Sequence, residues 1–403
     1  MLKNPRPPWQ DAAERPRFGL ATSAHTPQDF VHAKTMTLGL HEVHEALGAT
    51  FGEVAGEEVV LHYGDTAAEH AALSSAAAVV DLGFRGRFCL TGADRARLLH
   101  GQVTNDVQGL PPFHGCYAAF VTSKGKAQAD AFVYALTDEL LVDVEPGLTP
   151  LLLERLQHYI VADDVHCIDV APHYGLLSVQ GPDSRAALAS LALVPALPAQ
   201  PLQVTHAPDP VMGDVYLVRN PRLGSDGFDV FAPVAAQAML LDKLVAAARG
   251  KGGRLAGWSS FDLARIEAGI PRFGADIDDS NLAPEAGIES RAISYSKGCY
   301  IGQEVIARIR SYGQVAKSLR GLRLQPNTPI PAKGDRLLKD GKDVGYLTSV
   351  ARSHRANAVI ALGYVRRESN APGTRLVART ASGDAAAEIV PLPFVPPCPG
   401  RNS

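Results

Sequence analysis

The feature that most limits the fold of this chain is the loss of helical patterning after about Gln314. From there to about residue 395, six short apolar or alternating runs are separated by turns rich in Gly, Asp and Asn. These runs are SLRGLRL, DRLLK, DVGYLTSVA, NAVIALGYV, TRLVART and AAEIVPLP. Short strands joined by such turns are typical of a small β-barrel or sandwich. The sequence therefore predicts a separate all-β domain that begins near Tyr312.

The residues before this boundary mix strand-like and helical patterns. Strand-like runs occupy 87–90, 116–121, 131–136, 140–144, 176–179, 215–218 and 229–231. Helical spacing covers 149–160, with Thr149 as N-cap and Pro150 in the first turn, and 235–249, closed by Gly250. A third helix is expected from Ser259, whose spacing to Asp262 resembles a capping box, to Gly269. Because strands and helices alternate irregularly, the expected fold class is α+β.

Length and composition exclude several classes of protein. A chain of 403 residues can form two or three domains, and 46% hydrophobic residues with a net charge of −3 indicate an ordinary globular protein. The five cysteines contain no CxxC pair, which argues against a disulfide framework or a metal site and suits a reducing cytoplasm. The chain shows neither a membrane-length apolar run nor an apolar signal core, so we expect a cytoplasmic protein without membrane contact.

The stretch that carries the most chemical information is KGCYIGQE at 297–304. Glycines on both sides of Cys299 and Tyr300 impose a tight backbone path. Lys297, together with a helix expected to begin after Gly302, would lower the pKa of the Cys299 thiol and raise its thiolate fraction. The alternative for such a cysteine is burial in a packed turn.

This stretch resembles the KGC[FY]xGQE signature of the YgfZ family, and GQVTNDV at 101–107 is similar to that family's GQxTxDV run. Residues from about 38 to 395 also resemble the wider superfamily of the glycine-cleavage T-protein, an aminomethyltransferase. The runs that carry this wider resemblance are HYGD at 62–65, DLGFRG at 81–86, QGP at 180–182, GFDV at 227–230, ARIEAGI at 264–270 and NLAPE at 281–285.

The resemblance implies a T-protein-like fold around a central cavity that binds tetrahydrofolate or a one-carbon derivative. It divides the chain into a flexible extension at 1–35, a folate-binding region of two α+β subdomains at 36–312 and a β-barrel at 313–403. The residues expected at the site are Cys299 and Asp130 as catalytic groups, with Arg85, Asp130, Asp229, Arg265, Lys297 and Tyr300 as cofactor ligands.

Two of these roles have a specific chemical argument. The Asp229 carboxylate can accept a pair of parallel N–H bonds from the pterin, although an ordinary carboxylate beside a strand is solvated. Asp130 corresponds to the surviving carboxylate of a GGxxDD segment and would help move protons, the alternative being a local cap or pair. Arg265 lies in an apolar helix pattern, so it should pair with a carboxylate or reach the cavity, with Glu267 as a structural ion.

The leading hypothesis is a tetrahydrofolate-binding accessory protein that supports iron-sulfur cluster assembly or repair in client enzymes, including tRNA-modifying ones. The alternative is the aminomethyltransferase of glycine cleavage, against which stand Ala129, in place of a second carboxylate, and the KGCYIGQE run. A third is an interaction protein that has lost its ligand. The basic residues of 297–323 would meet an anionic folate tail, RNA or only solvent, and direct nucleic-acid binding is not expected without a recognisable module.

Overall fold

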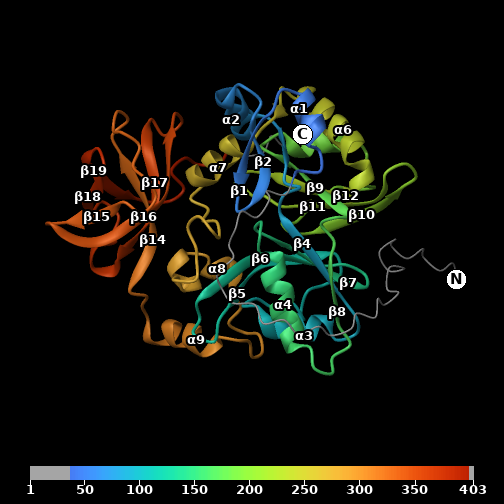
Figure 1. Cartoon of the computed structure of the whole chain (residues 1–403), viewed down its shortest axis with the longest axis horizontal. Helices are drawn as coiled ribbons and strands as arrows, with labels where there is room; N and C mark the ends of the chain where they lie inside the picture. The colour runs from blue at the N-terminus through green and yellow to red at the C-terminus, as the bar shows by residue number, and fades with distance from the viewer. Residues whose placement is uncertain (1–36, 399–403) are drawn as a thin grey trace, which may run out of the picture.

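The computed structural model describes residues 37–398, whose strands form two large sheets, a two-stranded ribbon and a closed barrel (Figure 1). The extension expected at 1–35 lies outside the described residues. The strands of the ribbon and the large sheets are β1 (Thr50–Val54), β2 (Glu57–His62), β3 (Ala78–Asp81), β4 (Gly86–Thr91), β5 (His114–Val121), β6 (Ala127–Ala135), β7 (Glu139–Val144), β8 (His166–Asp169), β9 (Tyr174–Gln180), β10 (Val204–Asp209), β11 (Gly213–Arg219), β12 (Gly227–Pro233) and β13 (Arg254–Leu255). All seven strand-like runs expected before the barrel overlap one of these strands.

One large sheet has the order β10-β11-β12-β9-β3-β13, and the other has the order β5-β6-β7-β4-β8. Their neighbouring strands pair antiparallel except β13, which runs parallel to β3. The helices that accompany them are α1 (His41–Ala46), α2 (Thr66–Ser75), α3 (Arg95–Gln102), α4 (Thr149–Tyr159), α5 (Ser184–Ala189), α6 (Gln237–Arg249), α7 (Trp258–Glu267), α8 (Glu289–Ala292) and α9 (Gln303–Tyr312). The predicted α+β class is therefore confirmed.

Two of the expected helix starts differ from the structure. Thr149 is the first residue of α4, and Leu148 is its cap. Helix α7 begins at Trp258 after Gly257, so the capping box expected at Ser259 is wrong. The Gly257 N–H donates to the Glu69 carboxylate at 2.9 Å, and a Cβ at this position would lie 2.3 Å from the Leu61 carbonyl oxygen. Tertiary contacts with α2 and β2 thus replace the local cap.

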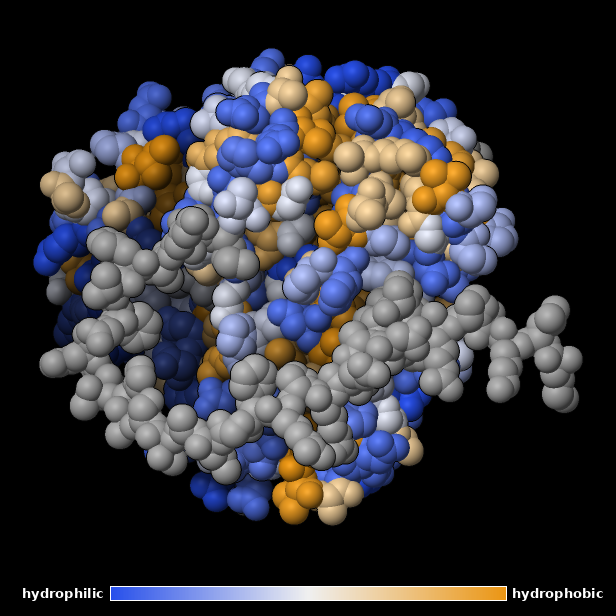
Figure 2. Space-filling view, turned by 45° about the vertical axis from the view of Figure 1, so that its right-hand side comes forward, coloured by the Kyte–Doolittle hydropathy of each residue, from blue (hydrophilic) through white to orange (hydrophobic). Residues whose placement is uncertain are grey.

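Each large sheet buries one face against helices and turns its other face toward the centre of the molecule. Leu240 and Leu244 of α6 share a buried cluster with Leu177 and Val230 of the six-stranded sheet. In the five-stranded sheet, residues such as Phe88 and Val142 share a second cluster with helices α3 and α4. Because side chains alternate along a strand, the residues between them face the space between the two sheets. On the face shown in Figure 2, hydrophilic residues are interspersed with hydrophobic ones.

The predicted C-terminal barrel is confirmed as a closed six-stranded barrel with the order β14-β17-β16-β15-β18-β19. Its strands are β14 (Lys317–Leu324), β15 (Arg336–Lys339), β16 (Lys342–Ser353), β17 (Ala358–Arg366), β18 (Arg375–Thr380) and β19 (Gly383–Val390). The barrel packs on α7, where Ile266 belongs to the same buried cluster as Leu319, Ile360 and Leu362. The helices found between residues 37 and 398 are too short or too polar to cross a membrane.

Two glycines with positive φ bound helix α9 and offer a matched pair for a stability test. A Cβ on Gly302 would lie 2.4 Å from the Thr122 carbonyl oxygen, whereas one on Gly313 would meet open space. We expect Gly313→Ala to lower the free energy of unfolding by about 1–2 kcal/mol, the usual cost of left-handed backbone in a residue with a Cβ. Gly302→Ala should cost at least about 1 kcal/mol more because the backbone must also shift. Urea denaturation measures both, and equal losses would contradict the close approach.

Candidate functional site

A cavity of about 420 Å³ lies between the two large sheets and helix α7. Its walls include the apolar side chains Leu82, Phe132, Leu202, Trp258, Phe261 and Ile270, together with Arg85, Asn105, Cys116, Tyr117, Asp130, Glu145, Asn220, Arg222, Arg265, Arg272 and Arg291. A second cavity of about 580 Å³ shares Arg85 but lies on the side of Glu57, Asp81 and Asp169. The first is the candidate site because several buried ionisable groups converge on it.

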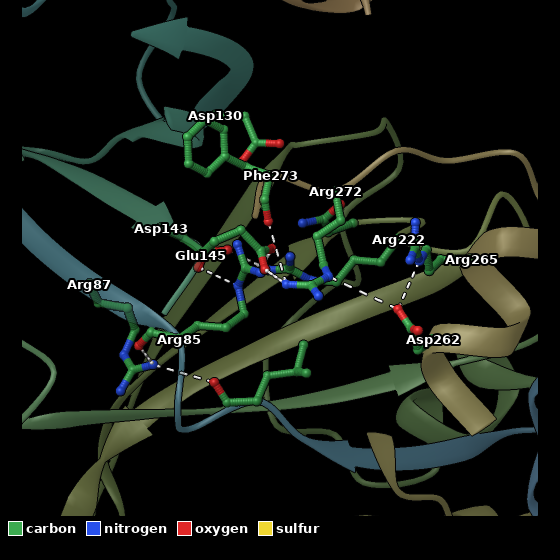
Figure 3. A network of polar contacts seen from close by, with 12 residues as sticks. Arg85, Arg87, Asp130, Asp143, Glu145, Arg222, Asp262, Arg265, Arg272 and Phe273 are labelled. Carbon is green, nitrogen blue, oxygen red and sulfur yellow. Dashed lines mark hydrogen bonds and ion pairs between the residues drawn. The ribbon is translucent and has the colours of Figure 1, made fainter. Parts of the chain in front are cut away.

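A network of paired charges borders this cavity, and its contacts are drawn in Figure 3. Arg85 Nε donates to Asp143 at 2.7 Å, while its Nη1 donates to Glu145. Arg272 Nη1 reaches the other oxygen of Glu145 at 3.0 Å, and Arg222 donates to Asp143. Burial alone would raise the pKa of Asp143 and of Glu145, but the adjacent guanidinium charges lower both below their usual values. These two carboxylates therefore stay ionised.

Asp130 differs from its neighbours because a phenol is its hydrogen-bond partner. The Tyr117 hydroxyl donates to Asp130 Oδ2 at 2.7 Å. Burial raises the pKa of Asp130 to about 6, and the negative charge of Glu145 acts in the same direction. The Tyr117 hydrogen bond and the more distant charges of Arg85 and Arg291 oppose this shift. A carboxyl group of this kind can hold or release a proton near neutral pH, as a general acid or base must.

Ala129, which replaces a second carboxylate in the resemblance, does not face the cavity. It is 1% exposed and packs in the apolar cluster of α3 and α4, on the opposite face of β6 from Asp130. A carboxylate at this position would enter the apolar core rather than the site. The presence of alanine therefore removes no group from the cavity wall.

Asp229 is fully buried, and its carboxylate is already committed within the protein. It accepts hydrogen bonds from Ser178 at 2.8 Å, from Asn220 at 2.9 Å and from Arg222 Nε at 2.9 Å. Asn220 and Arg222 line the cavity, whereas Asp229 lies behind them. The expected direct contact of Asp229 with a pterin would thus require these bonds to rearrange. In the observed arrangement Asp229 orients two lining residues.

Arg265 both lines the cavity and pairs with carboxylates, as the apolar helix pattern required. Its Nε donates to Asp262 at 2.8 Å, its Nη1 to Asp276, and its Nη2 to the Ser349 hydroxyl at 2.7 Å. Glu267 forms a separate network on the same helix, with His70 at 3.0 Å among its partners. The prediction that Glu267 is a structural ion is confirmed.

The three site residues expected in the KGCYIGQE run lie outside the cavity lining. Lys297 Nζ donates to the carbonyl oxygens of His100 at 2.5 Å, Val103 at 2.7 Å and Asn105 at 2.8 Å. Burial lowers the pKa of Lys297 to about 8. These three carbonyl oxygens therefore hold the Lys297 ammonium, which was expected to lower the pKa of the Cys299 thiol. Tyr300 is buried beneath α9, while Cys299 is exposed.

Several lining residues were missed in the sequence analysis. Glu145 lines the cavity directly after strand β7, and Asp143, which lies behind the lining and pairs with Arg85 and Arg222, is two residues earlier in this largely apolar strand. This spacing was a usable signal. Carboxylates on one face of a buried strand must find cationic partners. Arg222 and Arg272 lie in loops, where no periodicity marks a residue as buried. Cys116 is the thiol that lines the cavity, and burial raises its pKa to about 12, so it stays protonated.

Two α+β lobes with a cavity between them, and a β-barrel packed against helix α7, are the arrangement of the T-protein fold class. The GCVT N-terminal domain family matches residues 40–297, and the glycine cleavage T-protein C-terminal barrel domain matches residues 317–396. The chain belongs to the glycine cleavage T-protein superfamily, whose aminomethyltransferases use tetrahydrofolate for one-carbon transfer. The predicted cofactor is thereby confirmed for the family.

Similar proteins agree with this assignment. An aminomethyltransferase of Saccharopolyspora erythraea is 30% identical over 358 residues, covering 88% of this chain and 96% of its own length. A putative chloroplastic transferase of Arabidopsis thaliana is 26% identical over 88% of this chain and 80% of its own length. The crystal structure of aminomethyltransferase T from Bartonella henselae shares the fold, with a TM-score of 0.82, 24% identity and coverage of 90% and 99%. Membership of the YgfZ branch stays a prediction.

The raised pKa of Asp130 predicts a specific pH dependence of stability. A carboxyl group whose folded pKa exceeds its unfolded value of about 3.9 stabilises the fold at low pH and loses this contribution as pH rises through about 6. Relative to Asp130→Asn, the wild type should therefore lose about 1–3 kcal/mol of unfolding free energy between about pH 4 and about pH 7.5. Urea denaturation of both proteins across this range measures the difference, and parallel curves would contradict the shift.

Proposed function

We propose that the chain binds tetrahydrofolate, or a one-carbon derivative, in the cavity between its two lobes and transfers a one-carbon unit there. The observation that carries this proposal is the protonatable carboxylate of Asp130 in the cavity wall, beside carboxylates that are held ionised. The aminomethyltransferase reaction of the relatives fits this arrangement, since it requires a group that exchanges protons near neutral pH.

The residues present fit the proposed cofactor. The cavity lies within the usual range of small-molecule sites, ~300–1,000 Å³. Trp258, Phe261 and Phe132 offer apolar surfaces for a flat ring system. The lining arginines supply donors for an anionic tail, and Asp130 and Asn220 supply acceptors for ring nitrogens. When bound, tetrahydrofolate supplies the nitrogens that accept the one-carbon unit.

The chain's own contribution is proton control and positioning. Asp130 holds the proton that the departing amine must receive as ammonia leaves the carrier. The Tyr117 hydroxyl fixes the orientation of Asp130, because its hydrogen bond occupies Oδ2 and leaves Oδ1 for the ligand. Arg85 and Arg272 keep Glu145 ionised, which raises the proton affinity of Asp130.

Ammonia release with tetrahydrofolate and an aminomethyl-lipoyl carrier protein tests this reaction. Asp130→Asn should lower kcat by about 10²–10⁴-fold, the usual contribution of general acid-base catalysis, and leave cofactor affinity within a few fold. Asp384→Asn, at an exposed ion pair of the barrel, is the matched control and should keep wild-type turnover. Cofactor binding is followed by Trp258 emission in a Trp9→Phe background. Binding without turnover would contradict the transfer reaction, and lack of binding would contradict the cofactor as well.

One observation favours a second candidate function, namely support of iron-sulfur cluster assembly or repair in cytoplasmic client enzymes, including those that modify tRNA. Cys299 is an exposed free thiol within the run that resembles the YgfZ signature. Its exposure makes it accessible to a client protein or a redox partner while the cavity holds folate. In this candidate function the cysteine acts at the surface rather than on the cofactor.

Complementation of cells that lack the native gene tests this second function. Cys299→Ser should lower the activity of client cluster enzymes severalfold, because the exposed thiol is lost while the cavity is unchanged. Cys398→Ser removes another exposed thiol and should have no effect. Wild-type client activity with Cys299→Ser would contradict the accessory function and would leave the proposal of folate binding unaffected.

A further inference from the structure

One wall of the cavity is a short segment, residues 270–277, that is folded around the carboxylate of Asp276. This side chain is fully buried, and its Oδ2 accepts hydrogen bonds from the Arg272 N–H at 3.2 Å and from the Arg265 guanidinium. The backbone closes the same turn, because the Asp276 N–H donates to the Arg272 carbonyl at 2.8 Å. The carboxylate therefore fixes both arginines at the cavity edge.

The other oxygen of Asp276 is held by the barrel rather than by the lobe that carries the segment. Thr348 Oγ1 lies 2.5 Å from Asp276 Oδ1 and 3.1 Å from the Leu362 carbonyl oxygen. A hydroxyl has one proton, and the shorter contact, to the Asp276 carboxylate, takes it. Thr348 is the extra residue of an irregularity in β16, between the pairs Leu347–Gly363 and Ser349–Leu362. Such a bulge re-aims a side chain out of the regular alternation.

The next residue, Ser349, completes the contact between the barrel and the cavity wall. Its hydroxyl accepts from Arg265 Nη2 at 2.7 Å. Thr348 and Ser349 are both buried, at 5% and 7% exposure, so solvent does not substitute easily for these bonds. The two consecutive hydroxyls thus hold both ends of the Asp276–Arg265 pair.

Arg265 and Arg272 each keep N–H groups that make no hydrogen bond within the described residues. Arg272 Nε is buried and makes no hydrogen bond within residues 37–398, and its ion-pair contact with Asp262 Oδ1 is long, at 4.0 Å. Within the same residues, the Arg265 bonds to Asp262, Asp276, Ser349 and the Ile270 carbonyl account for four of its five N–H groups. A buried donor without a partner is costly, so its persistence beside a cavity points to a ligand acceptor.

We propose that strand β16 of the barrel positions these donors, with Thr348 and Ser349 as positioning residues that set the Arg265 and Arg272 guanidinium groups against an acceptor group of the cavity ligand. This inference rests on the proposed function for the identity of the ligand. It gives the barrel a part in ligand binding although its residues lie outside the cavity lining.

The test compares Thr348→Val and Ser349→Ala with Ser353→Ala, all in a Trp9→Phe background. Ser353 is the control because it lies on the same strand and its hydroxyl donates to the buried carboxylate of Glu267 in α7. Glu267 does not line the cavity. Thr348→Ser restores the hydroxyl. The readouts are the Kd for tetrahydrofolate, acrylamide quenching of Trp258 in the ligand-free protein, and Tm. Trp258 reports on the segment because the Arg272 guanidinium carbon lies 5.1 Å from its ring centroid.

We expect Thr348→Val and Ser349→Ala each to raise the Kd about tenfold, the worth of one hydrogen bond to a charged group, and to increase quenching of Trp258. Ser353→Ala should change Tm alone, and Thr348→Ser should return both other readouts to wild-type values. If Thr348→Val and Ser349→Ala matched Ser353→Ala in Kd and in quenching, the positioning role would be overturned. Should the wild type not bind tetrahydrofolate, the proposed function fails, and quenching alone still decides the role of β16.

Discussion

The architecture depends on one buried set of ion pairs that joins the two sheets. Arg222, in the loop between β11 and β12, donates to Asp229 of its own sheet and to Asp143 of the other. Arg85, in the connection from β3 to β4, pairs with Asp143 from the opposite side. Removing one partner from a buried ion pair costs about 3–5 kcal/mol. A shift of one sheet relative to the other would break these pairs and is therefore opposed. A cavity of fixed shape between the lobes follows from this constraint.

The same pairing explains why one carboxylate of the cavity differs from the others. Arg85 and Arg272 direct their N–H groups at Glu145, and Arg85 and Arg222 direct theirs at Asp143. Asp130 is left with a phenol and lies in the field of the ionised Glu145. The protein thus places carboxyl groups of the neighbouring strands β6 and β7, and of the residue that follows β7, in two different protonation states. This separation is the usual basis for assigning an acid or base among several carboxylates.

The sequence predicted the parts of the fold and site that local patterns encode. Six strand-like runs predicted the barrel. The apolar helix pattern around Arg265 predicted that it would pair with a carboxylate or reach the cavity, and it does both. Patterns of this kind fail for contacts between distant segments. The ammonium of Lys297 bonds carbonyl oxygens almost 200 residues earlier in the chain, so its neighbour in sequence, Cys299, was a poor guide to its neighbour in space. Arg222 and Arg272 were missed because a loop has no periodicity that marks burial.

The structure separates the KGCYIGQE run into residues that folding requires and one that folding leaves unexplained. Lys297 ties the run to 100–105, and the Asn105 side chain of that segment lines the cavity. Gly302 has no space for a Cβ, and Tyr300 fills the core beneath α9. Packing accounts for these three residues whatever the protein does. Cys299 is exposed and lies outside the cavity lining, so packing does not account for it, and the role proposed for its thiol is at the surface.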